Sequence, residues 1–217
     1  MVQRVFSLRV LFLLLMIFFG FLLVFTVSAQ EDGGGEEMPI ESEWTGPLPG
    51  AYVRGDIMFT MSAGALFPVL FLDGSTRPAK AYDGKIKIGG VGTLGLNYFL
   101  TPDVFLGVEI NGGFSGSVNN LLFQFPFGLR AGYQFIFRRF EFPVSLMIGA
   151  SSQTYLTKHY FGLFLKPEAA AYWRFNPDWS FGINVGWWWV PQWPKRGPAY
   201  NRYGNFLDVT LSARYVL

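Results

Sequence analysis

Apolar residues alternate with small, polar or charged residues with a period of two along most of this chain. The alternation is continuous in eight segments, which cover residues 57–67, 86–98, 104–114, 121–137, 140–150, 163–175, 179–189 and 207–217. Successive side chains of a β-strand point to opposite faces of the sheet, so this period predicts eight strands. One phase of the eight segments holds no charged residue, whereas the opposite phase carries ten. The sequence therefore predicts an all-β domain with one apolar face and one charged face.

The aromatic residues indicate which face points outward. The uncharged phase is rich in rings, for example Phe123, Phe125 and Phe127, whereas glycines such as Gly128 and Gly132 belong to the charged phase. The interior of an eight-stranded barrel is only just wide enough to be filled by side chains. The numerous aromatic rings of the uncharged phase must therefore lie outside. A soluble lipocalin-like barrel would show the same alternation turned inside out. Lipid solvates a continuous outer apolar band, and an open sheet edge in lipid would leave backbone groups unpaired. We predict a closed, antiparallel, up-and-down eight-stranded transmembrane β-barrel.

The connections between the segments alternate in length. Tight turns with typical turn residues are expected at 101–103 and 176–178, whereas 68–85, 115–120, 151–162 and 190–205 are longer. Bacterial outer-membrane barrels have short periplasmic turns and longer external loops. The pattern therefore predicts an outer-membrane location in a diderm bacterium, with both termini in the periplasm.

Three stretches of sequence resemble small outer-membrane barrels of the OmpX, OmpA-domain and OmpW kind. Residues 98–109 and 172–182 look like their strand–turn–strand units, and 207–217 is similar to the signal read by the barrel-assembly machinery. Leu217 departs from the usual terminal Phe of that signal. The resemblance covers about residues 50–217 and implies outer-membrane lipids and the assembly machinery as partners. The OmpW likeness implies a conduit for small hydrophobic solutes.

The N-terminus has the character of a secretory signal. Arg4 and Arg9 precede the apolar run 10–27, and small residues follow before Gln30. The alternative is an uncleaved anchor helix, because the run approaches the ~18 residues of a transmembrane candidate. We predict a signal peptide over 1–29, an acidic linker over 30–50 and the barrel over 51–217.

Composition excludes several classes of function. The chain has no Cys and one His, so we expect no disulfide, no lipid-modified cysteine and no His-rich metal site. Without the two signal arginines, 17 − 2 = 15 basic residues balance 15 acidic ones. We expect no nucleic-acid partner and no cofactor, and we assign no catalytic or metal-binding residues.

The ten charges of the inward phase form a predicted lumen network. They are Asp56, Lys87, Glu109, Arg130, Glu141, Lys166, Glu168, Arg174, Asp208 and Arg214. One interpretation is a selective pore lined by charge. The other is an ion-paired plug, which the five acids and five bases favour because an isolated buried charge is costly.

Two further sets of residues are predicted to face the surroundings of the barrel. Interface girdles account for the aromatics Tyr98, Trp173, Trp179, Trp187, Trp189 and Tyr215. A sugar platform on Trp187 to Trp189 is the alternative. The outer loops carry seven bases against two acids, a net charge of +5, and the candidate contact residues are Trp193, Lys195, Arg196 and Arg202. They predict contact with an anionic lipid, polysaccharide or host surface, or else a solvated loop.

A rim enzyme is the remaining alternative. Lipid-deacylating barrels carry Ser two residues after the catalytic His, but here Phe161 follows His159 at that position. Ser151 and Ser152 are the nearby substitutes. The sequence favours a non-enzymatic barrel that acts in surface interaction or envelope integrity, with a conduit as the second function and a lipid-modifying enzyme as the third. The oligomeric state stays open.

Overall fold

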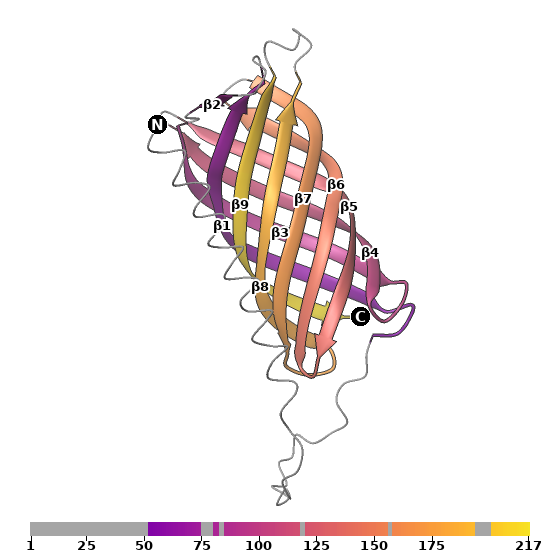
Figure 1. The fold of residues 1–217 in the computed structure, drawn as a ribbon. Coiled ribbons are helices and arrows are strands. Elements are labelled where there is room, and N and C mark those ends of the chain that lie inside the picture. Colours follow the sequence, from indigo (N-terminus) through magenta and orange to yellow (C-terminus); the bar gives the residue numbers. More distant parts are fainter. Residues whose placement is uncertain (1–51, 75–79, 83–84, 118–119, 156–157, 194–200) are drawn as a thin grey trace, which may run out of the picture. The chain divides into compact units, whose positions relative to one another are not determined.

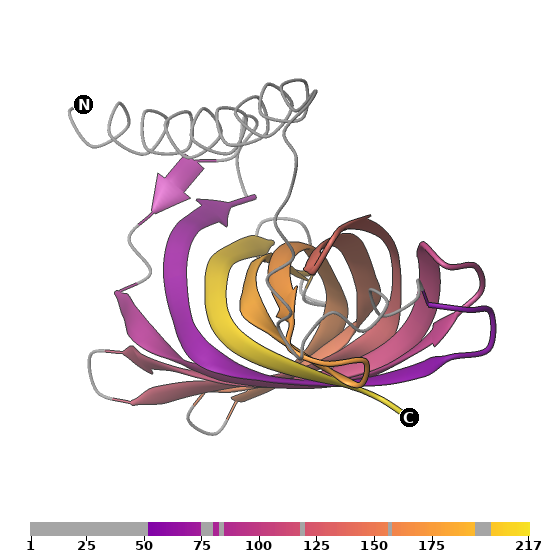
Figure 2. The same cartoon turned by 90° about the horizontal axis from the view of Figure 1, so that it is seen from below.

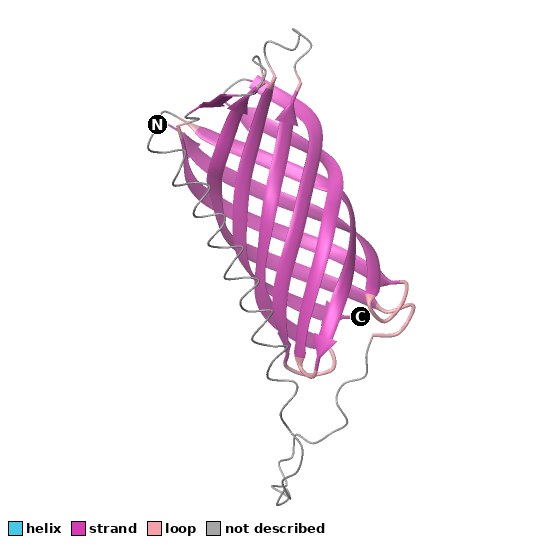
Figure 3. Cartoon of the chain, viewed as in Figure 1, coloured by secondary structure: helices cyan, strands magenta, loops and turns pink. Residues whose placement is uncertain are grey.

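The computed structural model describes residues 52–74, 80–82, 85–117, 120–155, 158–193 and 201–217. The predicted signal peptide and acidic linker lie outside the described residues. Strands form nearly all of the described part (Figure 3). Their bounds are β1 (Ile57–Asp73), β2 (Lys80–Tyr82), β3 (Ile86–Phe99), β4 (Val104–Ser117), β5 (Leu121–Phe137), β6 (Phe140–Tyr155), β7 (Lys158–Arg174), β8 (Trp179–Gln192) and β9 (Arg202–Val216). Within these residues no helix is long and apolar enough to cross a membrane.

The strands form one closed antiparallel sheet. From β3 to β9 each strand pairs with its neighbours in sequence, and β1 pairs with both β3 and β9 (Figures 1 and 2). The pairing of Met58 with Val216 closes the ring near the two ends of the chain. The three-residue strand β2 adds to the far end of β1, outside the ring. The predicted eight-stranded, up-and-down barrel is confirmed.

The strands continue beyond their predicted limits at one end of the barrel. The expected loops 115–120 and 151–162 shrink to 118–120 and 156–157, because β4, β6 and β7 extend into them. In this extension Gln153 pairs with Tyr160, and Thr154 pairs with His159. Apolar alternation marks the part of a strand that meets lipid, whereas backbone pairing continues where the outward side chains are polar. We call this end of the barrel the long-loop end, and the opposite end, with turns at 100–103, 138–139 and 175–178, the short-turn end.

The outer surface of the barrel is apolar. Leu129, Leu211 and Phe125 are 63%, 71% and 57% exposed, and the side chains between them along each strand are buried or half-buried. Lipid is the solvent in which a continuous belt of this kind is stable. The prediction that the aromatic phase faces outward is therefore confirmed.

Large apolar side chains also occupy the interior, which the sequence analysis described only as charged and small. A lower cluster at the short-turn end comprises Tyr52, Met58, Phe99 and Phe105. An upper cluster toward the long-loop end comprises Leu66, Val91, Leu122, Met147, Phe164, Trp188, Val190 and Phe206. The alternation along the strand could have indicated these inward residues. Trp188, for example, lies between the outward residues Trp187 and Trp189, so its side chain must point inward.

Candidate functional site

Between the two apolar clusters lies a central ion network organised around Lys166. Its ammonium donates to Glu109 Oε1 at 2.9 Å, contacts Glu168 Oε2 at 2.7 Å and lies 3.5 Å from Asp208 Oδ2. Asn111 Oδ1 accepts a further hydrogen bond at 3.2 Å. All of these groups are buried, so Lys166 neutralises carboxylates that water cannot reach.

Arg130 is the second cation of the central network. Its guanidinium pairs with Glu168 and lies 3.2 Å from Glu109 Oε2, and its Nε donates to Ser145 Oγ at 3.0 Å. Two cations therefore face three carboxylates. Each of Glu109 and Glu168 is shared between Lys166 and Arg130, which couples β4, β5 and β7 across the lumen, and the contact of Lys166 with Asp208 adds β9.

A second, basal network lies near the short-turn end around Glu141. Arg174 Nε donates to Glu141 Oε1 at 2.5 Å, and Arg214 lies 3.3 Å from Oε2. The Tyr52 hydroxyl donates to the same carboxylate at 3.0 Å, and its ring stacks on Phe99 with centroids 4.2 Å apart. Burial, and then the negative charge of Glu141, raise the pKa of the Tyr52 phenol. Tyr52 precedes the first strand, yet it fills the end of the lumen as a protonated donor.

The structure brings eight of the ten predicted lumen charges into these two networks, four acids and four bases. The other two, Asp56 and Lys87, are corrections. Asp56 precedes β1, where its carboxylate accepts a hydrogen bond from the Val53 amide at 2.9 Å and so caps a turn. Lys87 is exposed, because the pairing of β3 with β4 shifts register between Ile86 and Gly89 and ends the regular alternation there. Among the described residues no group of three or more His, Cys, Asp or Glu could hold a metal ion.

Gly186 is a narrow point of the central network. A Cβ at this position would collide with the Asp208 carboxylate and lie 2.7 Å from Lys166 Cε. We expect Gly186→Ala to lower the free energy of unfolding by about 1–3 kcal/mol, the usual range for overpacking. The midpoint of urea unfolding in lipid vesicles measures this change. Gly92→Ala is the matched control, because the nearest atom to its Cβ is the Ser62 carbonyl oxygen at 3.8 Å; equal effects would contradict the prediction.

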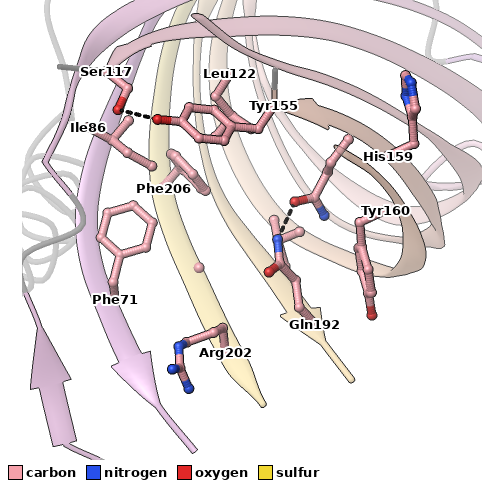
Figure 4. A pocket seen from close by; sticks show the side chains of 13 residues that line it. Phe71, Ile86, Ser117, Leu122, Tyr155, His159, Tyr160, Gln192, Arg202 and Phe206 are labelled. Carbon is pink, nitrogen blue, oxygen red and sulfur yellow. Dashed lines mark hydrogen bonds between the residues drawn. The ribbon is translucent and has the colours of Figure 1, made fainter. Parts of the chain in front are cut away.

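Above the upper cluster, the long-loop end contains a cavity of about 460 Å³, which we call the mouth pocket (Figure 4). Eight strands contribute to its wall, namely β1 and β3 to β9. Its lining residues are Phe71, Ile86, Ser117, Leu122, Gln153, Tyr155, His159, Tyr160, Val190, Gln192, Arg202, Gly204 and Phe206. The buried apolar members belong to or pack on the upper cluster, so the pocket has an apolar floor and a more polar rim.

Hydrogen bonds that join β6 to β8 and to β4 across the mouth order this rim. Gln192 Nε2 donates to Gln153 Oε1 at 2.7 Å, and the hydroxyls of Ser117 and Tyr155 lie 3.3 Å apart, as Figure 4 shows. Arg202 Nη1 donates to Asp73 Oδ1 at 2.5 Å, so this predicted contact residue belongs to an ion pair at the mouth. Arg202 was predicted from the sequence as a contact residue, whereas the amide and tyrosine side chains of the rim were not. Their signal was weak, since polar residues at strand ends resemble ordinary loop residues.

His159 and Ser151 do not form a catalytic pair. His159 Nδ1 lies 3.0 Å from Thr154 Oγ1, and both residues belong to the outward phase of their strands. Ser151 is buried on the inward phase, and its hydroxyl has no hydrogen-bond partner. Ser151 and His159 are therefore not hydrogen-bonded to each other, although His159 also borders the mouth pocket. Ser152, the other substitute predicted from the sequence, is exposed on the same outward phase as His159.

Comparison with known proteins places this geometry in a wider class. A protein-family model matches residues 45–215, and the chain belongs to the family that this model describes. The crystal structure of OprG from Pseudomonas aeruginosa has a TM-score of 0.53 at 11% identity, over 77% of this chain and 98% of that one. Neisserial surface protein A gives a TM-score of 0.50 at 11% identity, over 72% and 96%. The chain is a small β-barrel of the outer-membrane type.

In sequence, the barrel is similar to proteins of a spirochaete. An uncharacterised protein of Treponema pallidum (strain Nichols) is 34% identical over 101 residues, which are 46% of each chain. The chain spans about half the length of the relatives that it matches. The structural likenesses at 11% identity establish the fold of the barrel and leave its activity open.

The predicted interface aromatics lie toward the two ends of the outer-membrane-type barrel. Tyr98, Trp173, Trp179 and Tyr215 are near the short-turn end, where the rings of Trp179 and Tyr215 are 4.9 Å apart. At the long-loop end, Trp187 Nε1 donates to Asn205 and Trp189 stacks on Tyr203. Trp193 is exposed beside Trp189, whereas Lys195 and Arg196 lie outside the described residues.

Proposed function

We propose that this barrel is an integral outer-membrane protein with a sealed lumen that acts in surface interaction at its long-loop end. In this proposal the short-turn end and both termini face the periplasm, as in other bacterial barrels with short periplasmic turns. Outer-membrane lipids, the barrel-assembly machinery and an anionic surface or host ligand are the proposed partners.

The observation that carries the proposal is the filled interior. Along the barrel axis follow the lower cluster, the basal network, the central network and the upper cluster. Phe99, Trp188 and Phe164 are fully buried in the two clusters, and the networks pair four acids with four bases. A conducting path would require several rings to leave their packing and would break charge pairs whose removal from water is already costly. The lumen therefore fits a plug better than a pore.

The exposed face at the long-loop end is the remaining place for activity. It combines the mouth pocket with Trp193 and the basic segment predicted from the sequence. We propose a non-enzymatic role, because the hydroxyl of Ser151, one of the serines considered as nucleophile, has no hydrogen-bond partner and so is not activated by His159. The third function, a lipid-modifying enzyme, would instead have to use Thr154, whose Oγ1 lies 3.0 Å from His159 Nδ1.

A second candidate is a conduit for small hydrophobic solutes. The apolar floor of the mouth pocket, formed by Leu122, Val190 and Phe206, favours it, because such a floor can accept an apolar molecule. Onward passage would require the upper cluster to open beneath the solute.

Planar-bilayer recording separates these two functions. We expect the refolded barrel to insert and to show no discrete openings, because its lumen is filled by packed rings and paired charges. Heat-modifiable migration on a gel establishes closure of the same sample, and a porin recorded in the same bilayer serves as positive control. Discrete openings from a sample that is closed by this criterion would overturn the sealed barrel and favour the conduit.

A further inference from the structure

Polar groups without partners lie in and just beneath the mouth pocket. Gln153 is 4% exposed and lines the pocket, and its Nε2 has no hydrogen-bond partner, although its Oε1 accepts from Gln192. Neither the nitrogen nor the oxygen of the Gln124 amide is paired, and the Ser151 hydroxyl is also unpaired. A buried polar group without a partner costs about 1–3 kcal/mol, so native proteins satisfy it with protein, water or ligand.

These groups are neighbours on one wall. Gln124 on β5 pairs in register with Gln153 on β6, and Ser151 precedes Gln153 by two residues on the same inward face. The unused hydrogen-bonding capacity is therefore concentrated in one strip of β5 and β6, and it reaches the cavity at Gln153. Other unpaired atoms, such as those of Asp208, Arg214 and Gln134, lie in or beside the two ion networks and not in the lining of the pocket.

Aromatic rings form other parts of the same cavity. Phe206 is 2% exposed in its floor, and Phe71 meets it edge to face with centroids 5.4 Å apart. Tyr155 on β6 and Tyr160 on β7 also line the cavity, and Figure 4 shows the Tyr155 hydroxyl directed toward Ser117. The ligand thus needs a flat apolar face for the rings and hydrogen-bonding groups for the amides.

Charge narrows the class of ligand further. Among the described residues that line the pocket, one side chain carries a formal charge, that of Arg202. It forms an ion pair with Asp73. The groups without partners are amides and a hydroxyl, which suit neutral donors and acceptors. A volume of about 460 Å³ falls within the usual range for a small-molecule site.

We propose that the mouth pocket binds an uncharged saccharide unit, with the Gln153 amide hydrogen-bonded to its hydroxyls and the half-buried Phe71 ring against its apolar face. The proposal deepens the proposed function, since it names the ligand class for a barrel that acts at its long-loop end. It differs from a platform on Trp187 and Trp189, because those side chains lie on the outer face of the wall.

Calorimetric titration of the folded full-length barrel with the disaccharide N,N′-diacetylchitobiose tests the proposal. The barrel is held in an amine-oxide detergent or in lipid nanodiscs, because glycoside detergents would compete for the pocket. We expect saturable binding with a Kd of about 1 mM or tighter. Tetrahydropyran-2-methanol, a pyran ring without ring hydroxyls, should bind at least about tenfold more weakly, because it leaves the amides unpaired.

Two variants locate the binding. Gln153→Leu should weaken disaccharide binding by at least about tenfold, whereas Val53→Ala, which shortens an exposed side chain at the short-turn end, should leave it unchanged. Heat-modifiable migration shows that both variants are folded. Absence of saturation up to about 10 mM disaccharide, equal binding of the two ring compounds, or undiminished binding by folded Gln153→Leu would overturn the saccharide site. If Gln153→Leu does not fold, Gln192→Leu, at the half-buried rim, gives the same test.

Bilayer recording keeps the two proposals apart. A sealed barrel that does not bind the disaccharide contradicts the saccharide site and leaves the sealed lumen standing. A barrel that shows discrete openings and still binds through Gln153 contradicts the sealed lumen and leaves the site standing.

Discussion

Replacement of Lys166 by methionine is expected to lower the free energy of unfolding by about 3–5 kcal/mol, the range found when one partner of a buried ion pair is removed. Methionine preserves most of the side-chain volume but removes the charge that lies between Glu109, Glu168 and Asp208. Arg130 would then face three buried carboxylates without a second cation. Equilibrium unfolding in urea, performed in lipid vesicles and followed by tryptophan fluorescence, measures the loss.

Lys87→Met is the matched control for this experiment. Lys87 is exposed at the long-loop end of β3 and belongs to neither ion network, so its replacement should change stability by less than about 0.5 kcal/mol. A similar loss in the two variants would show that the Lys166 ammonium contributes nothing specific. It would also remove the energetic basis for the plug.

Leu211→Arg is expected to destabilise the barrel by about 2–4 kcal/mol, the cost of Arg on the lipid face near the bilayer midplane. Leu211 is 71% exposed, and it pairs with Ala63 and Ile183 in the middle of β9. A charged side chain there must reach either the headgroups or a water defect. The same vesicle unfolding experiment applies, and the effect should shrink in thinner bilayers.

Val53→Arg provides the comparison for the lipid-facing substitution. Val53 is 60% exposed but precedes β1, outside the strands of the belt, so an added charge should cost close to nothing. If Leu211→Arg is equally harmless, the outer apolar surface does not face hydrocarbon, and the membrane assignment fails.

The fold was predictable because one physical rule governs most of the chain. Inward and outward side chains alternate along every strand, and the aromatic residues identify the lipid side without knowledge of the register. The extra residues at the long-loop end were not predictable in this way. Gln153, Thr154 and His159 continue the backbone pairing in a polar environment, where hydropathy carries little information.

The alternation of inward and outward positions predicted which charged residues belong to the ion networks. It did not predict which of them pair with each other. Lys166 reaches Glu109 across 57 residues of sequence, and this contact depends on the stagger between strands, which composition does not encode. The alternation also gave the wrong prediction for two residues at the ends of strands. Asp56 lies just before the regular strand begins, and the register shift near Lys87 turns that side chain outward. The mouth pocket was missed because its residues become neighbours only when eight strands close into the barrel.

The pairing of β1 with β9 has a consequence for the order in which the protein is made. These strands hold the first and last parts of the barrel, so their hydrogen bonds cannot form until β9 has been synthesised. Contacts so distant in sequence are slow to form, and until they do, two strand edges and the apolar belt are open to other chains. Newly made molecules are therefore expected to need chaperones on the way to the membrane. Loss of β9 would leave a sheet with two unpaired edges that can pair with other chains.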